Sequence, residues 1–414
     1  MSNLPSDLVL KNARVPASLI ADQEKFGGRR SGDCLSGDVI VKSGCIAGMT
    51  DISVSADLPV IDLQEKLVFL KLTEAHCHLD KCHTIERMPD AGGDLMAAGS
   101  AQKVDKENWT AEDIRERAER GLTELYEAGC GYVRTHIDWQ MGAKNPPLAW
   151  HVINELAHDW RDKLQLHTAA LIDLDHFEDH DLGALTAGQV ASNTGVLGAF
   201  ILGHENTAPK LDRIFALANE HGLHLDFHVD ESLEGHGDGV EAIADASLRN
   251  APHGAVLCGH ACSLINRQGD HLQQVIEKLA RAEIGIAALP STNLYLQSRN
   301  QGTPTHRGLT CVHELVQGGV NVVFGSDNVR DAFCPIGFHD PMSALSLGAL
   351  SAHLDPPYDR WLTTVTTNAA KVIGNLRLSV DQAALDDLVF SEAKYTSELV
   401  AGLKGKPRRL ENLT

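Results

Sequence analysis

The stretch that decides the fold is VFLKLTEAHCHLD, residues 68–80, a short apolar run that ends in two histidines. Side chains of a strand alternate between its two faces, so His76 and His78 point the same way and Cys77 points the other way. Seven more short apolar runs follow along the chain. The predicted strands are residues 68–76, 132–137, 164–172, 196–201, 223–229, 255–260, 284–290 and 321–327.

The segments between these runs have the period of amphipathic helices. In residues 111–129 the apolar positions Ile114, Ala118, Leu122 and Leu125 recur at helical spacing, and residues 210–222 repeat the pattern with Leu211, Phe215 and Ala218. Strands that alternate with helices over roughly 300 residues are typical of a (β/α)8 barrel. The sequence therefore predicts an α/β fold, a TIM-like barrel over residues 68–374.

The two flanks have a different pattern. Period-two strand patterns separated by glycine and polar turns occur in DLVLKNARV, GDVIVKSGCIAGM and LPVIDLQ near the start, and in DDLVFSE at 386–392. No helical periodicity occurs in these stretches. We expect residues 1–67 and 375–414 to form one small β-sandwich domain beside the barrel.

Composition excludes several classes of function. The chain has 414 residues, 43% of them hydrophobic, which is enough for a large core. Its 56 acidic and 36 basic residues give a formal charge of -20, so nucleic-acid binding is not expected. No apolar stretch approaches the ~18 residues of a membrane span, and the first residues do not resemble a secretion signal. We expect a cytoplasmic protein without membrane contact.

Five metal-capable side chains end four of the predicted strands: His76, His78, His228, His260 and Asp327. The carboxyl ends of barrel strands face the active site, so these groups are expected to converge. A buried imidazole or carboxylate without a partner costs a few kcal/mol, roughly, and a shared metal ion removes that cost. Three imidazoles and one carboxylate suit Zn(II), Fe(II) or Mn(II). We expect one divalent ion, Zn(II) or Fe(II).

Catalysis on such an ion needs groups that move protons. Glu231, three residues beyond His228, is the best placed carboxylate on a loop at a strand end. Asp327 can bind the metal and also take a proton from water. His260 is either a further ligand or a donor that polarises the substrate, and we favour the donor, because a catalytic ion must keep an open position.

Other histidines near the strands are given lesser roles. His136 and Asp138 in RTHIDW end the second strand, and we favour a hydrogen-bonding pair behind the ligands there over a further pair of ligands. No role is assigned to His83, Cys82 or His204. A zinc finger in HCHLDKCH is not expected, because the two faces of a strand separate Cys77 from the neighbouring histidines.

The same residues carry a resemblance to a known family. AHCHLDK, LDFHVDES, CGHAC, NLYLQSR and FGSDNVRDAFCPIG resemble the motifs of the cytosine deaminase branch of the amidohydrolase superfamily. The resemblance implies that His76, His78, His228 and Asp327 hold one metal ion. It further implies that Glu231 shuttles protons and that His260 orients water and substrate. No carboxylated lysine is expected after the fourth strand.

Departures from that branch concern the substrate pocket, which we expect at Leu171, Asn328 and Phe333. Leu171 stands where cytosine deaminases carry a glutamine that reads the pyrimidine edge, and Phe333 stands where they carry tryptophan. The wording SDNVRD is closer to N-isopropylammelide amidohydrolase. Cytosine itself is therefore not the expected substrate.

The resemblance implies a hydrolytic deaminase of a small aminated nitrogen heterocycle, in which metal-bound hydroxide attacks the C–N carbon and ammonia leaves. Two alternatives stay open. One is an amidohydrolase that releases an alkylamine or opens a cyclic amide, and the other is a barrel that binds a metal or a ligand without turnover. A homo-oligomer is a family-level expectation.

Overall fold

The computed structural model describes residues 4–51, 58–88, 92–193, 195–299, 303–304, 306–375 and 379–410. Its larger part is a barrel of parallel strands that pair in chain order, with the last strand brought back to the first by a bridge between Cys77 and Asp327. The strands are β7 (Leu72–Cys77), β8 (Cys130–Trp139), β9 (Gln165–Asp173), β10 (Val196–Ile201), β11 (His224–Val229), β12 (Val256–His260), β13 (Gly285–Ala288) and β14 (Asn321–Phe324). The predicted fold class is confirmed.

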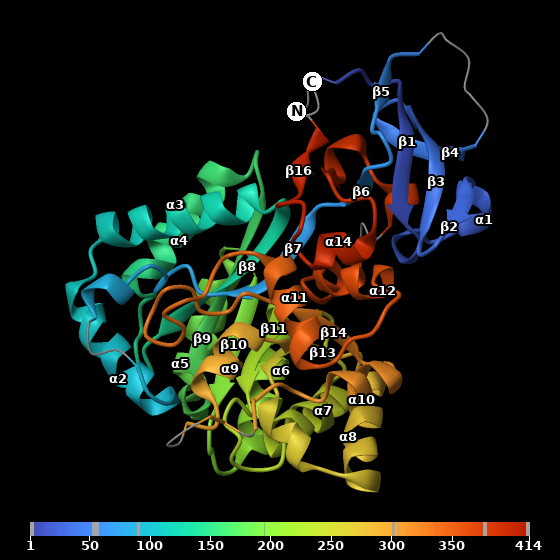
Figure 1. Cartoon of the computed structure of the whole chain (residues 1–414). Coiled ribbons are helices and arrows are strands. Elements are labelled where there is room, and N and C mark those ends of the chain that lie inside the picture. The colour runs from blue at the N-terminus through green and yellow to red at the C-terminus, as the bar shows by residue number, and fades with distance from the viewer. Residues whose placement is uncertain are drawn as a thin grey trace.

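Helices form a layer around the strands (Figure 1). They are α2 (Leu95–Asp105), α3 (Ala111–Glu127), α4 (Leu148–Trp160), α5 (His180–Ala191), α6 (Thr207–His221), α7 (Asp238–Asn250), α8 (Gly269–Arg281), α9 (Pro290–Leu296), α10 (Val312–Gln317), α11 (Pro341–Ser351), α12 (Asp359–Leu362) and α13 (Thr367–Val372). The apolar positions predicted for α3 and α6 are buried. Burial of these helix stripes against the strands supplies the barrel's main driving force.

Both ends of the chain build a second sheet. Its strands are β1 (Leu8–Pro16), β2 (Arg29–Ser31), β3 (Cys34–Lys42), β4 (Cys45–Thr50), β5 (Val60–Asp62), β6 (Leu67–Leu70), β15 (Leu388–Ser391) and β16 (Arg408–Arg409). Figure 1 shows the blue amino-terminal strands beside the red carboxyl-terminal ones, with short helices α1 (Gln23–Phe26) and α14 (Thr396–Val400) nearby. The prediction that the two termini meet in a small β domain is confirmed.

The first apolar run differs from its prediction as one strand. It holds two strands of different sheets, since β6 pairs with β15 while β7 pairs with β8. The change occurs at Lys71, whose N–H donates to the carbonyl of Asp387 at 2.8 Å. Apolar residues on both sides of Lys71 are buried, so the local pattern contains no sign of the change of sheet.

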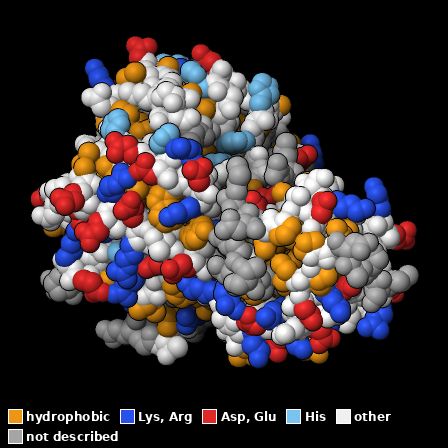
Figure 2. Space-filling view, turned by 90° about the horizontal axis from the view of Figure 1, so that it is seen from above, with side chains coloured by type: hydrophobic (Ala, Val, Ile, Leu, Met, Phe, Trp, Pro, Cys, Tyr) orange, Lys and Arg blue, Asp and Glu red, His pale blue; other side chains and the backbone are white. Residues whose placement is uncertain are grey.

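The surface carries charges of both signs. On the face seen in Figure 2, Lys and Arg side chains lie among Asp and Glu side chains rather than in one basic stripe. Within the described residues, no helix combines the length and the apolar character needed to cross a membrane.

Candidate active site

Four imidazoles meet at the carboxyl ends of the barrel strands. His76, His78, His136 and His228 are buried, and each offers a ligand atom within 4.8 Å of the others. Nε2 of His78 and Nε2 of His228 lie 3.2 Å apart, at hydrogen-bonding distance. The prediction that His76 and His78 point the same way holds, while Cys77 packs in the hydrophobic core.

Asp327 joins this cluster from just beyond β14. Its Oδ1 lies 3.3 Å from His78 Nε2 and 3.6 Å from His76 Nε2. The Asp327 N–H donates to the carbonyl of His76 at 2.9 Å, which fixes its backbone beside β7. With His76 and Asp327, His260 completes a second set of ligand atoms within 4.8 Å. The five residues singled out in the sequence therefore lie together.

These buried groups fit a metal ion because hydrogen bonds satisfy few of their polar atoms, and the contact between Nε2 of His78 and Nε2 of His228 is an exception. Within the described residues, no hydrogen-bond partner is found for the nitrogens of His76, for Nδ1 of His78 and of His228, or for either carboxylate oxygen of Asp327. Burial, followed by the neighbouring charged groups, holds the pKa values of the three imidazoles well below their usual range. Neutral imidazoles and a carboxylate offer the lone pairs that a divalent ion binds.

Glu74 is a site residue that the sequence reasoning missed. It is fully buried, and it accepts hydrogen bonds from the His76 N–H at 3.0 Å and from the Ser326 hydroxyl at 2.5 Å. Burial raises the pKa of its carboxyl to about 8. Glu74 thus joins the backbone of β7 to the segment that carries Asp327. Its position two residues before His76, inside a buried run, was the available signal.

His136 departs from the predicted pairing with Asp138. Its Nε2 lies 2.9 Å from Oδ1 of Asp226, and Oδ2 of Asp226 accepts from Arg134 at 2.9 Å. His136, Asp226 and Arg134 are fully buried. The carboxylate of Asp138 instead lies between two ammonium groups, that of Lys81 at 2.7 Å and that of Lys106, which directly follows α2. Two cations attract the Asp138 carboxylate more strongly than one imidazole ring does.

Glu231 and His260 lie at the edge of the cluster. Glu231 Oε2 is 3.7 Å from His260 Nε2. Burial, and then the charge of Asp327, raises the pKa of Glu231 to about 8. Asn293 on α9 donates its amide to His260 Nδ1 at 3.1 Å, so the proton of the neutral ring sits on Nε2, facing Glu231.

Leu171 and Phe333, two of the residues expected to contact the substrate, lie on either side of the ion pair between Lys81 and Asp138. Leu171, on β9, is paired in register with Asp138, the partner of Lys81. The Lys81 ammonium lies 5.3 Å from the centre of the Phe333 ring. The third residue, Asn328, directly follows Asp327 and is buried.

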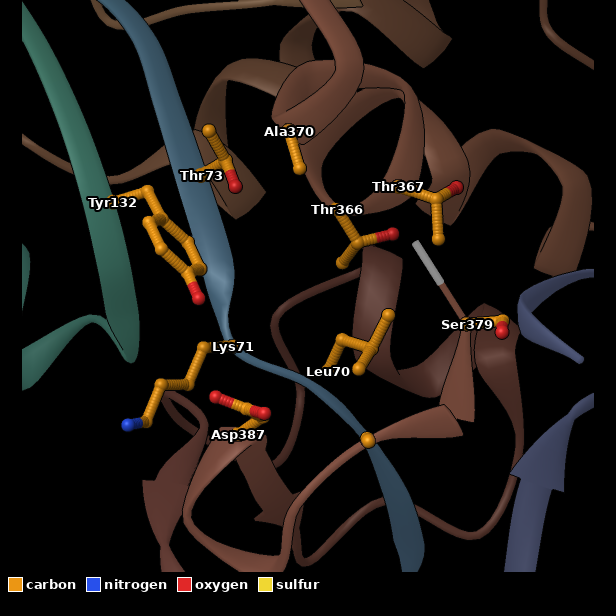
Figure 3. Close-up of a pocket in the computed structure, with 10 residues that line it drawn as sticks. Leu70, Lys71, Thr73, Tyr132, Thr366, Thr367, Ala370, Ser379 and Asp387 are labelled. Atoms are coloured by element: carbon orange, nitrogen blue, oxygen red, sulfur yellow. The ribbon is translucent and has the colours of Figure 1, made fainter. Parts of the chain in front are cut away.

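A small pocket at the opposite end of the barrel is a weaker candidate. Figure 3 shows Thr73 and Tyr132, from the starts of β7 and β8, facing Thr366 and Ala370. Active sites of such barrels lie where the strands end. The histidine cluster, and not this pocket, is therefore the candidate site.

Comparisons with known proteins identify the family and several relatives of this chain. The model of the Amidohydrolase family matches residues 86–379. A pterin deaminase from Rhizobium rhizogenes strain K84 is 35% identical over 399 residues, which cover 95% of this chain and 90% of that protein. The N-isopropylammelide isopropyl amidohydrolase of Pseudomonas sp. strain ADP is 23% identical over 323 residues, 76% of each chain.

Among solved structures, 5-methylcytosine deaminase from Klebsiella pneumoniae, liganded with 5-fluorocytosine, matches with a TM-score of 0.78 and 23% identity over 98% of this chain and 94% of that one. The N-isopropylammelide isopropylaminohydrolase of Burkholderia multivorans matches with a TM-score of 0.76 and 19% identity, covering 97% of this chain and 96% of that one. These structures share the fold. Taken with the family match and the 35% identical relative, they show that this chain belongs to the amidohydrolase family.

Proposed function

We propose that this chain is a metal-dependent hydrolytic deaminase of an aminated nitrogen heterocycle, with pterins as the favoured substrate class. The observation that carries the proposal is the buried set of imidazoles and Asp327, most of whose polar atoms have no hydrogen-bond partner within the described residues, with the protonatable Glu231 beside it. The pterin deaminase that is 35% identical over nearly the whole chain supports the choice of substrate.

His76, His78, His228 and Asp327 would hold one divalent ion, Zn(II) or Fe(II). When bound, such an ion acts as a Lewis acid and lowers the pKa of a water molecule from about 15.7 to about 7. His136 faces the same space, with Asp226 behind it as the partner that orients a histidine of a metal site.

Glu231 is the proposed proton carrier. With a pKa of about 8 its carboxyl is protonated at neutral pH, so it can give a proton to the ring nitrogen next to the reacting carbon as the water oxygen attacks. One proton of the water then passes through the carboxylates of Asp327 and Glu231 to the exocyclic amine, and the second proton of the water returns Glu231 to its protonated form. The C–N bond breaks, ammonia leaves, and the carbon keeps the oxygen as a carbonyl.

His260 is proposed to orient the substrate and the attacking water. Its Nε2 proton faces Glu231, and Asn293 fixes the tautomer from the other side. A hydrogen-bond donor held in this way does not have to reorganise as negative charge develops in the transition state.

The proposed pocket walls favour a fused ring over cytosine. Leu171 cannot form a hydrogen bond with a pyrimidine edge, whereas the Phe333 ring offers an apolar face to a flat heterocycle. Asn328 donates its amide to Asp331 at 2.6 Å, and within the described residues its Oδ1 forms no hydrogen bond, so that oxygen can accept from a substrate amine.

A substrate screen tests the proposal. Metal-loaded protein is incubated with pterins, aminopyrimidines, aminotriazines and creatinine-like rings, and ammonia is measured. We expect release from a pterin at a higher kcat/KM than from cytosine. If no compound released ammonia, the result would favour a barrel that binds a metal or a ligand without turnover.

A second candidate function is release of an alkylamine from a substituted triazine. It is favoured by the SDNVRD stretch, residues 326–331, and by the 23% identical N-isopropylammelide isopropyl amidohydrolase. Product analysis separates the two functions, because only this one yields isopropylamine in place of ammonia.

A further inference from the structure

A second cluster of metal-capable side chains lies outside the proposed catalytic centre. It consists of His83, on the loop after β7, Glu124 on α3, and His339 just before α11, and we call it the His83 cluster. Three segments that are far apart in the sequence thus meet at one carboxylate. The sequence reasoning gave His83 no role and did not single out the other two residues.

The geometry of the His83 cluster suits a tetrahedral ion. Oε2 of Glu124 lies 3.2 Å from Nε2 of His83 and 3.0 Å from Nδ1 of His339. Ligand atoms of a tetrahedral Zn(II) site, bound at about 2.0–2.1 Å, are separated by about 3.3 Å. All ligand atoms of the cluster lie within 4.8 Å of one another.

Burial also indicates a ligand at this place. The side chains of His83 and His339 are 3% and 0% exposed, while that of Glu124 is 29% exposed and leaves a route from solvent. Within the described residues, neither ring nitrogen of His83 has a hydrogen-bond partner of acceptable geometry. The close approach of Nε2 to Oε2 without alignment is the arrangement of two ligands, not of a donor and its acceptor.

The residues around Glu124 leave one of its carboxylate oxygens, Oε2, available for an ion. Arg120 donates to Oε1 of Glu124 at 3.2 Å, so Oε2 is the oxygen that faces both imidazoles. Gly121 makes room for His339, because a Cβ at that position would lie 2.9 Å from Cε1 of the ring. Arg120 and Gly121 are consecutive residues of α3, so the first holds the Glu124 carboxylate and the second leaves space for the His339 ring.

We propose that His83, Glu124 and His339 form a second site for a transition metal ion of the Zn(II) class. The two imidazoles and one carboxylate are borderline ligands that suit Zn(II), and water fills the remaining position. The single negative charge of Glu124 offsets part of the charge of the ion. This proposal stands apart from the proposed deaminase activity.

An ion at the second site would connect two segments that carry catalytic groups. His83 follows His78 on the same loop, and its N–H donates to the carbonyl of Val329 at 3.0 Å, two residues past Asp327. His339 ends the loop that starts after β14. Binding is therefore expected to stabilise the folded protein at the end of the barrel where the metal ligands meet.

Metal counting tests the second site. Wild-type protein and the variants Glu124→Gln and His83→Gln are equilibrated with Zn(II), desalted and analysed for zinc. We expect the wild type to hold one equivalent more than either variant, and its thermal midpoint to rise more on zinc addition. The control His253→Gln changes an exposed histidine outside the cluster and should match the wild type. Equal zinc content in wild type and Glu124→Gln would overturn the proposal.

The difference between proteins reports on the second site alone, since a failure of the catalytic site would lower all counts together. A crystal of the wild-type protein grown with Zn(II) gives a reading that needs no variant. An anomalous peak between His83, Glu124 and His339 is expected. An empty cluster at saturating zinc would show that these residues are only a hydrogen-bonded network.

Discussion

The two histidine clusters differ in how many hydrogen-bond partners their buried imidazoles have. At the strand ends, His76, His78 and His228 gather with one carboxylate, Asp327, and in the described part of the chain most of their polar atoms have no hydrogen-bond partner. In the His83 cluster, one carboxylate already lies between two imidazoles, and His339 hydrogen-bonds to Glu124. The first cluster therefore depends on an ion more than the second does, and we expect it to bind metal more tightly.

The largest expected effect comes from breaking the first cluster. Asp327→Asn keeps the shape of the side chain and removes the only charge among the proposed ligands. We expect loss of the catalytic metal and a fall in kcat/KM of about 10³- to 10⁴-fold, corresponding to several kcal/mol of lost transition-state stabilisation. Zinc content and ammonia release measure it, with the exposed Asp386→Asn as the control. An Asp327→Asn protein with full metal and full turnover would remove Asp327 from the ligand set.

A second change separates metal binding from proton transfer. Glu231→Gln keeps the size of the side chain but cannot release a proton, so we expect kcat/KM to fall by about 10²- to 10⁴-fold while the zinc content stays at the wild-type value. Steady-state rates and metal analysis on the same preparation check it. Undiminished turnover would exclude Glu231 from the mechanism.

Asp226, the partner of His136, can be tested by measuring the free energy of unfolding. Asp226→Asn leaves the fully buried guanidinium of Arg134 without a counter-charge. Breaking a buried ion pair from one side costs about 3–5 kcal/mol of unfolding free energy. Denaturant unfolding of the two proteins measures the loss. A cost below about 1 kcal/mol would mean that water reaches Arg134, contrary to its burial.

The smallest expected effect concerns the loop between the two clusters. Arg117 donates to the carbonyls of Asp80 and Cys82, and Asp113 holds its guanidinium at 2.9 Å. Although burial opposes ionisation, hydrogen bonds from Arg87 and Arg117 lower the pKa of Asp113 below its ordinary value. Asp113→Asn is expected to cost about 0.5–1 kcal/mol at neutral pH.

The sign of the pH dependence follows from the direction of that shift. A carboxylate with a depressed pKa in the folded state stabilises the fold above its unfolded pKa of about 3.9, and this contribution disappears as the pH falls through the folded value. The difference in thermal midpoint between wild type and Asp113→Asn should therefore be constant near neutral pH and shrink below about pH 4. A difference that grows in acid would contradict the assignment.

The barrel could be predicted from the sequence because its strands are short apolar runs and its helices have buried stripes, both of which are local patterns. The convergence of His76, His78, His228 and Asp327 also follows, since strand ends of a barrel share one face. Other features depend on contacts between distant residues. His136 meets Asp226, 90 residues later, and the sequence offered Asp138 as a nearer partner.

The His83 cluster shows the same limit. Glu124 lies on an amphipathic helix among several other charged residues, and His339 follows a loop without a regular pattern. Only the packing of α3 against the loops after β7 and β14 brings these residues to His83. No periodicity in the sequence predicts that contact.

Ammonia release from a pterin, measured against bound metal, is the decisive test of metal-dependent deamination by this protein. Metal is removed with a chelator, zinc is returned in steps, and the rate is followed together with the oxo product. We expect a rate near zero without metal that rises in proportion to the first equivalent bound, with one ammonia for each oxo product. A metal-free protein that releases ammonia at the full rate, or a fully loaded one that releases none, would contradict it.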